Sequence, residues 1–289
     1  MPLTIATCQF PVGPDPRENC RRILRLMREA KARGADVIHF PEGSLGGYAG
    51  FDFPSFRGYD WPLLRRCMGR VQEEARRLRL AAIVGSNHSL TPPHRPHNSL
   101  YLIDARGRIA DRYDKRFCMG RPGELDLRHY SPGTRFTVFT LKGVRCGLLI
   151  CHDWRYPELY RQYRRLGVRL LFQSWYDGGM KPAAYARTGR LLGEVIPATV
   201  RGHAVCNHLW ISAANTSKPQ SCFGALVIRP DGKIAGRLPR NRTGILITKV
   251  NPRLRLPDPA APWRDRAIRG ILHSGTAVRD PRSRDRRSL

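Results

Sequence analysis

The sequence predicts an α/β fold with mixed β-sheets. Apolar, strand-like runs alternate along the chain with amphipathic segments whose apolar residues recur at helical spacing. Short turns at Ala105-Arg106-Gly107 and Lys142-Gly143 each join two strand-like runs. Such hairpins add antiparallel strands to a sheet that the alternating pattern would otherwise make parallel. Hydrophobic residues make up 41% of the 289 residues, enough for a sizeable core.

The first part of the chain alternates between strands and helices. We expect strands at residues 3–10, 35–40 and 80–85, and helices from residue 16 to about 33 and over 61–78. Asp15 is a typical N-cap, and Pro16 fits the first helical position. Gly34 is suited to the C-terminal end of the same helix. The second strand places Glu42 just beyond its C-terminal end.

The remaining elements follow in the same way. We expect hairpins over 99–113 and 136–150, helices over 157–166 and 183–205, and strands at 168–174, 209–214, 222–228 and 243–250. Pro197 predicts a bend in the long helix. Lys115 follows the first hairpin, and Cys151 follows the second.

The net charge of +28 raises the question of a nucleic-acid partner. The excess is nearly all Arg and is spread along the whole chain, and we find no zinc finger, helix-turn-helix or RNP-like aromatic motif. We therefore expect no specific nucleic-acid partner, only non-specific binding to polyanions at low salt.

The N-terminal residues and the cysteines indicate the compartment. Met1-Pro2-Leu3 leads directly into a strand-like run without the features of a signal peptide, and no apolar run reaches the length of a membrane span. The eight cysteines form no C-x-x-C pair and lack zinc-site spacing. We expect a cytoplasmic protein with reduced thiols, no membrane contact and no metal.

Three short segments carry the candidate chemistry: Phe40-Pro41-Glu42, Tyr113-Asp114-Lys115 and the block from Cys151 to Glu158. Together they supply a carboxylate, an ammonium group and a thiol. Cys151 lies between a buried strand and the helix that starts at Pro157, and such a junction aims a side chain into a pocket. A structural role is the alternative, and it fits the other seven cysteines better than Cys151.

These segments resemble the nitrilase, or carbon–nitrogen hydrolase, superfamily from about residue 3 to about residue 250. The resemblance rests on an ordered set of motifs: FPE followed by LGGY at 45–48, YDK at 113–115, CHDWRYPE at 151–158, VRGHA at 200–204 leading to AAN at 213–215, and RPDGK at 229–233. Any one of them alone would be weak, but five in one order are specific.

The resemblance implies a four-layer α-β-β-α sandwich and a single catalytic domain over residues 1–278. It also implies a homodimer or higher homo-oligomer, with residues 252–278 as a possible dimer contact. Residues 279–289 are basic and almost without apolar side chains, so we expect a mobile tail.

The resemblance also assigns roles to the three reactive groups. Cys151 would be the nucleophile, Glu42 the general base, and Lys115 with the backbone N–H of His152 the partners of the oxyanion. The implied reaction is hydrolysis of a small linear amide or N-carbamoyl compound through a thioester, without a metal or organic cofactor. For Glu42 and Lys115, a surface carboxylate and a solvated lysine are the alternatives.

Two positions depart from the family pattern. Family members carry a second glutamate seven residues before the glycine of a Pro-Gly pair, which here falls on Asp126, with Glu124 two residues earlier. We favour Asp126 and keep Glu124 as the alternative. Phe117 replaces a family histidine, which indicates a changed pocket wall. The other candidates for that wall are Tyr48, Trp154, Trp175 and Tyr176.

Other functions remain open at this point. The same triad could hydrolyse a nitrile or transfer an acyl group to an amine. A protein of another class, non-catalytic or polyanion-binding, could retain the fold, although the presence of Glu42, Lys115 and Cys151 argues against it.

Overall fold

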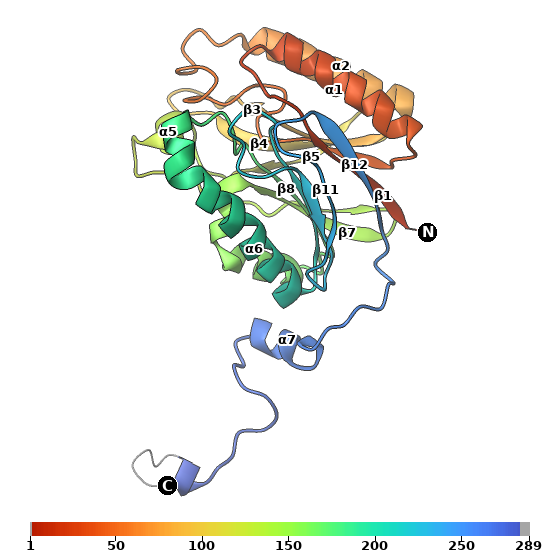
Figure 1. The fold of residues 1–289 in the computed structure, drawn as a ribbon, viewed down its shortest axis with the longest axis vertical. Coiled ribbons are helices and arrows are strands. Elements are labelled where there is room, and N and C mark those ends of the chain that lie inside the picture. The colour runs from red at the N-terminus through yellow and green to blue at the C-terminus, as the bar shows by residue number, and fades with distance from the viewer. Residues whose placement is uncertain (1, 284–289) are drawn as a thin grey trace.

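The computed structural model describes residues 2–283 and contains two six-stranded sheets packed face to face (Figure 1). In sheet order, the first consists of β12 (Gly244–Val250), β1 (Leu3–Gln9), β2 (Val37–His39), β3 (Ala81–His88), β4 (His97–Ile103) and β5 (Ile109–Asp114). The second consists of β11 (Ile234–Arg237), β10 (Leu226–Ile228), β9 (Trp210–Ala214), β8 (Leu170–Ser174), β7 (Val144–Ile150) and β6 (Val138–Leu141).

Both sheets are mixed, as the sequence predicted. The three central strands of the first sheet, β1, β2 and β3, are parallel, and so are β7, β8 and β9 in the second. The hairpins β4–β5 and β6–β7 supply antiparallel pairs, and β12 returns antiparallel to β1. Because parallel strands share a direction, their carboxyl ends meet at one edge of each sheet.

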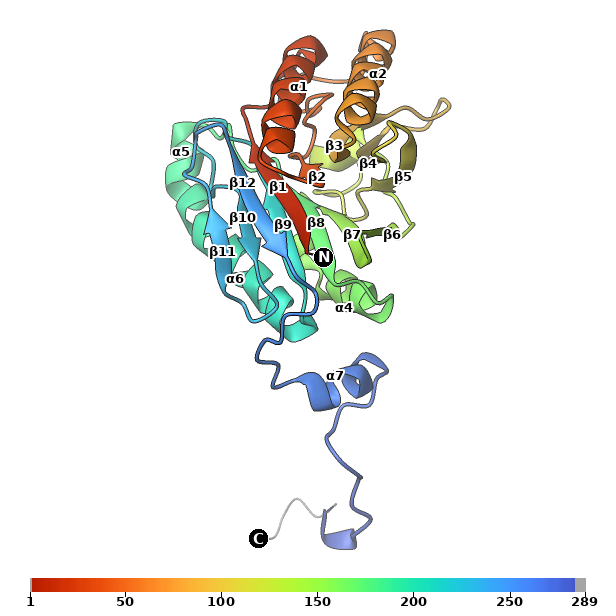
Figure 2. The same cartoon turned by 90° about the vertical axis from the view of Figure 1, so that its right-hand side faces the viewer.

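Helices cover both outer faces, which gives the four-layer α-β-β-α arrangement (Figure 2). The helices α1 (Pro16–Ala32) and α2 (Trp61–Leu78) lie on the first sheet, and α4 (Pro157–Arg165) and α6 (Arg190–Asn207) lie on the second. Asp15 caps α1 by accepting a hydrogen bond from the Arg17 amide at 2.9 Å, and Gly34 follows that helix with a φ of 77°.

Strand β1 packs against both neighbouring layers of the sandwich. Leu3 and Ile5 point into the core between the sheets, whereas Ala6 and Cys8 point to the core beneath α1 and α2. A polar contact also crosses between the sheets, where Thr7 and Ser212 are joined by hydroxyl groups 2.7 Å apart. The stacking therefore fixes the position of one sheet's strand ends relative to the other's.

The predicted continuous helix over 183–205 is interrupted. The structure has a short α5 (Pro182–Ala184), a π-helical turn at Tyr185–Gly189 and then α6, with Pro197 inside α6. A side-chain carbon at Gly189 would lie 2.3 Å from the Tyr185 ring. A side chain at residue 189 would therefore force the Tyr185 ring to shift.

Three elements were not predicted: the short β11 and α3 (Leu125–His129), and the helix α7 (Ala261–Ile268) near the C-terminus. After β12 the chain leaves the sandwich and forms α7, which packs near α4 within the predicted extension 252–278. Of the predicted tail, residues 279–283 are exposed and include a 3-10 turn at Pro281–Ser283, and residues 284–289 lie outside the described range.

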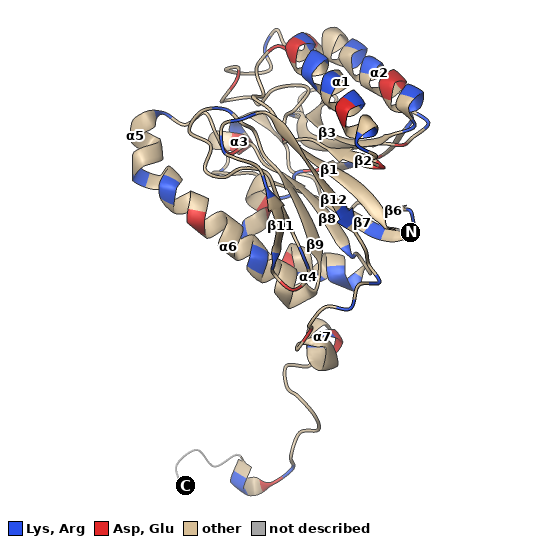
Figure 3. Ribbon diagram, turned by 45° about the vertical axis from the view of Figure 1, so that its right-hand side comes forward, with Lys and Arg blue, Asp and Glu red and all other residues tan. Residues whose placement is uncertain are grey.

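Basic residues occur on α1, α2, α4 and α6, so both outer layers carry positive charge (Figure 3). Among residues 2–283, none of the helices combines the length and the apolar composition that a membrane crossing needs.

Candidate active site

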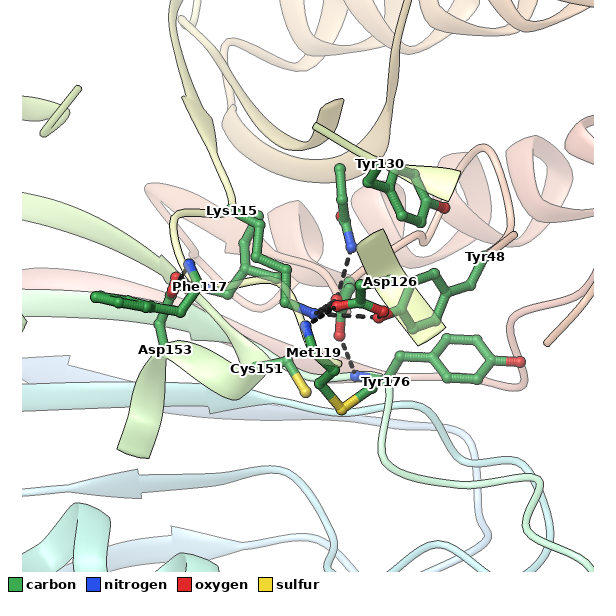
Figure 4. Close-up of polar contacts among 12 residues, drawn as sticks. Tyr48, Lys115, Phe117, Met119, Asp126, Tyr130, Cys151, Asp153 and Tyr176 are labelled. Atoms are coloured by element: carbon green, nitrogen blue, oxygen red, sulfur yellow. Dashed lines mark hydrogen bonds and ion pairs between the residues drawn. The ribbon is translucent and has the colours of Figure 1, made fainter. Parts of the chain in front are cut away.

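Cys151 begins a 3-10 helix, Cys151–Arg155, directly after β7. Its φ of 38° lies in the left-handed region, which costs a non-glycine residue about 1–3 kcal/mol. The sequence predicted Cys151 at a junction between a strand and the helix starting at Pro157, and the structure forms one tight turn at that junction. The turn holds the thiol beside the polar cluster drawn in Figure 4.

Asp153 holds this turn in place. Its carboxylate is fully buried and accepts hydrogen bonds from the Ile150 amide at 3.0 Å, the Tyr113 hydroxyl at 2.8 Å and the Phe117 amide at 3.0 Å. Burial raises the pKa of Asp153 to about 6. The residue therefore ties the end of β7 to the end of β5 on the facing sheet.

Glu42 lies just beyond β2, and its carboxylate is fully buried. One oxygen accepts hydrogen bonds from Lys115 at 2.9 Å and from the Asn98 side chain at 2.7 Å, and the other accepts one from the Tyr176 amide at 2.9 Å. The loop that carries Glu42 runs so close to β3 that a side-chain carbon at Gly85 would lie 2.3 Å from a backbone oxygen. Both features fix the direction of the carboxylate.

Lys115 lies at the end of β5 and is fully buried. Its ammonium group donates to Glu42 at 2.9 Å, to Asp126 at 2.8 Å and to the Tyr48 hydroxyl at 3.1 Å. Burial alone would lower the pKa of Lys115, but its acidic neighbours, Glu42 foremost, raise that pKa well above the usual value. The lysine is therefore a fixed positive charge.

The two candidates for the second acid occupy different environments. Asp126 lies in α3, is 1% exposed, and accepts hydrogen bonds from the Tyr48 hydroxyl at 2.6 Å and the Met119 amide at 3.0 Å, besides Lys115. Burial opposes ionisation, but Lys115 outweighs it and lowers the pKa of Asp126. Glu124 is exposed at the N-cap of α3. Of these two candidates, only Asp126 contacts Lys115.

A cavity of about 150 Å³ opens beside the thiol. Its wall contains Cys151, His152 and three of the predicted wall residues, Trp154, Trp175 and Tyr176. Apolar side chains from distant parts of the chain complete most of it: Phe51, Met119, Met180, Leu192 and Ile196. The space next to the candidate nucleophile is therefore small and largely apolar.

Two predicted wall residues lie elsewhere. Phe117 was placed in the wall wrongly: its ring stacks on Tyr156 with centroids 3.5 Å apart, and 37% of the residue is exposed. The hydrogen bond from the Phe117 amide to Asp153 sets the backbone so that the ring turns away from the cavity. Tyr48 is fully buried behind the wall, where it bonds with Lys115 and Asp126.

Burial is the main influence on the two residues at the nucleophile turn. It raises the pKa of the Cys151 thiol well above its ordinary value, with Glu42 adding to the rise and Lys115 opposing it. The resting sulfur is therefore a thiol that needs a base. Burial, with Lys115 and Arg155, lowers the pKa of His152 to about 4, so its ring is neutral at pH 7. The His152 amide lies in the first helical turn, where N–H groups lack helical partners.

Two further polar residues of the site, Asn98 and Asp177, were not predicted from the sequence. Asn98 binds Glu42 from β4, and Asp177 lines the cavity after β8. The available signal for Asn98 was its place directly before the hairpin predicted to start at residue 99. For Asp177 the signal was its place directly after the predicted wall residues Trp175 and Tyr176.

The family model described as carbon-nitrogen hydrolase matches residues 4–256. The chain belongs to the carbon–nitrogen hydrolase family. The predicted resemblance is thereby confirmed, and so is an enzyme class that hydrolyses carbon–nitrogen bonds.

Similar proteins include N-carbamoylputrescine amidase of Arabidopsis thaliana, 28% identical, with 74% of this chain and 70% of that protein covered. Omega-amidase NIT2 of Bos taurus is 26% identical, with 81% and 83% covered. A solved mutant of the amidase from Nesterenkonia sp. AN1 matches with a TM-score of 0.73 at 22% identity, over 93% of this chain and 97% of that one. That structure shows covalent addition of the acetamide moiety of fluoroacetamide at its active-site cysteine. Its likeness confirms the predicted sandwich fold.

Proposed function

We propose that this chain hydrolyses the C–N bond of a small linear amide or N-carbamoyl compound through a thioester on Cys151. The observation that carries the proposal is the position of Cys151, in the wall of a small cavity and beside a buried carboxylate and ammonium group. The amidase relatives and the cysteine adduct in the Nesterenkonia amidase also support it.

In the first half-reaction, Glu42 takes the thiol proton as the sulfur of Cys151 forms a bond to the carbonyl carbon. The carbonyl π electrons move to oxygen, and Lys115 with the His152 N–H stabilises the negative charge. Glu42 then gives its proton to the nitrogen, the C–N bond breaks, and ammonia or an amine leaves. A thioester remains on Cys151.

In the second half-reaction, Glu42 takes a proton from water as the water oxygen attacks the thioester carbon. The C–S bond breaks, the acid leaves, and the proton returns from Glu42 to the sulfur of Cys151. Overall, the amide and one water become the acid and ammonia. Each step uses the same carboxylate, whose two oxygens are held by Lys115, Asn98 and the Tyr176 amide.

We assign the role of second acid to Asp126. Its ion pair with Lys115, at 2.8 Å and 1% exposure, gives the ammonium group a second buried acidic partner besides Glu42. Asp126 would act as a positioning residue, because it keeps Lys115 charged and in place for the oxyanion.

We further infer a homo-oligomer in the cytoplasm. The outer helix α6 exposes Leu191, Val195 and Val205, with exposures of 61%, 37% and 43%. Their spacing places them on one stripe of the helix, which suits a contact with a second copy. All eight cysteines are free, as is usual in a reducing compartment.

Ammonia release from a panel of amides, N-carbamoyl compounds and nitriles tests the proposed reaction, with Cys151→Ala in parallel. We expect release by the parent and none by the variant. Intact-mass measurement after rapid quenching should show an acyl adduct on the parent alone. Equal release by both proteins would overturn the assignment of Cys151.

A further inference from the structure

One carboxylate in the cavity wall takes no part in the proposed chemistry. Asp177 follows β8 and lines the same cavity as Cys151. Its Oδ2 atom is buried and has no hydrogen-bond partner within residues 2–283. A buried polar atom without a partner costs about 1–3 kcal/mol, and more if it is charged. A ligand with an N–H donor would remove that cost.

The backbone holds Asp177 in a fixed position. Its amide donates to the Asn215 side chain at 2.9 Å, and its carbonyl accepts hydrogen bonds from the Asn215 side chain at 3.3 Å and the Cys222 amide at 3.2 Å. The backbone of this cavity-wall residue is therefore rigid, which favours selective binding over adaptation.

The charge of Asp177 is not neutralised by its surroundings. Within the described part of the chain, no Lys, Arg or His nitrogen lies within 4.0 Å of its carboxylate. The other acid nearby, Glu42, is paired with Lys115. Burial raises the pKa of Asp177 to about 6, with a hydrogen bond between its carboxylate and the Cys222 thiol opposing the rise and Glu42 adding to it. At pH 7.5 the group is therefore mostly ionised.

Among residues 2–283, Arg155 is the one cation in the cavity wall, and it would favour an anionic substrate instead. Its side chain is exposed, and the guanidinium lies 4.5 Å from the centre of the Trp154 ring. Solvent and salt screen an exposed charge, whereas a buried carboxylate acts in a low-dielectric setting. The electrostatic preference inside the cavity therefore comes from Asp177.

We propose that Asp177 is a binding subsite for an ammonium group, which makes the substrate a short aliphatic amide or N-carbamoyl compound with a terminal amine. This inference rests on the proposed function, because it places the reactive carbonyl at Cys151. The cavity of about 150 Å³ has the volume of about five waters at ~30 Å³ each, so the chain between the carbonyl and the amine is only a few carbons long.

Matched substrates test the subsite. The amide series differs only at the terminal group: it consists of the cationic 4-aminobutanamide, its neutral isostere pentanamide and the anionic succinamic acid. For carbamoyl compounds, the matching pair is the cationic 3-aminopropylurea and the neutral butylurea. We expect the parent at pH 7.5 to have a kcat/KM at least tenfold higher for the cationic member of each pair. In Asp177→Asn that ratio should fall to near one. Asp265→Asn on α7 removes the same charge outside the cavity and should retain the ratio.

Binding to the Cys151→Ala protein, measured by calorimetry, gives a readout that does not need turnover. The cationic amide should bind at least tenfold more tightly than pentanamide, and adding Asp177→Asn should abolish the difference. Asp177→Ser replaces Asp177→Asn if thermal melting shows that the latter is unfolded. Equal binding of the two amides, or an unchanged ratio without Asp177, would overturn the subsite. Cys151-dependent hydrolysis without cation preference would overturn the subsite alone and leave the proposed function standing.

Discussion

Replacing Lys115 by Met tests how the buried charges of the site stabilise the protein. The Lys115 ammonium group is fully buried and forms ion pairs with Glu42 at 2.9 Å and with Asp126 at 2.8 Å. Met retains much of the length of the side chain but removes the charge. The variant therefore leaves two buried carboxylates close together without a cation.

Removing one partner of a buried ion pair destabilises a protein by about 3–5 kcal/mol. For a chain of this size the melting temperature should fall by roughly 6–20 °C, at about 2–4 °C per kcal/mol. The pKa of Asp126 is lower in the folded protein than in the unfolded chain. Its contribution to the free energy of unfolding is therefore present above the unfolded-state pKa and is lost as the pH falls through the folded-state pKa. The difference between parent and variant should therefore be largest near neutral pH and shrink in acid.

The assay is thermal unfolding of both proteins at pH 7.5 and pH 3, followed by circular dichroism, because pH 3 lies below the ordinary aspartate pKa of about 3.9. Lys142→Met is the matched control, because Lys142 pairs with Asp36 at the surface, with exposures of 51% and 22%. Exposed pairs contribute about 0–1 kcal/mol, so this variant should melt close to the parent. Equal losses in the two variants, or a loss for Lys115→Met that grows in acid, would refute the reasoning.

Three further predictions follow from the geometry. Asp126→Asn should reduce the rate of ammonia release at least tenfold and Glu124→Gln less than twofold, because Asp126 contacts Lys115 and Glu124 does not. A larger loss of initial rate in Glu124→Gln than in Asp126→Asn would exclude Asp126 as the second acid. Gly85→Ala should lower both kcat and the melting temperature, because the added methyl carbon would lie 2.3 Å from a backbone oxygen of the loop that carries Glu42 and would displace that loop. An unchanged kcat would contradict this. Asp153, with a pKa of about 6, binds a proton more readily in the folded protein than in the unfolded chain. The stabilisation that its protonated form gives to the fold is therefore lost as the pH rises through 6. The loss of unfolding free energy between pH 4 and pH 8 amounts to at most about 3 kcal/mol. Urea unfolding of the parent at these two pH values should show it, and Asp153→Asn should not.

Local sequence signals predicted most of the elements. The helix Trp61–Leu78 and the strand Val144–Ile150 have the bounds that the sequence predicted. Periodicity and turn residues are properties of neighbouring positions, so they are visible without the fold. Strand β11 and helix α3 were missed because each is only four or five residues long and offers little periodic pattern.

By itself, the sequence determined the α/β class, the order of the elements, and the placement of Glu42, Lys115 and Cys151 at the ends of strand-like runs. The tertiary structure decided which of these groups meet. Glu42 and Lys115 are 73 residues apart, and no local pattern could give the 2.9 Å between them.

Tertiary structure also decided the direction of individual side chains. It turned Asp126 rather than Glu124 towards the lysine, and among the described residues it left one oxygen of the Asp177 carboxylate, Oδ2, without a hydrogen-bond partner. Local propensity selects helix or strand at each position, but the distance between side chains depends on how two sheets stack and which strand ends meet. That stacking arises from contacts between residues far apart in the chain, where a single sequence carries no periodic signal.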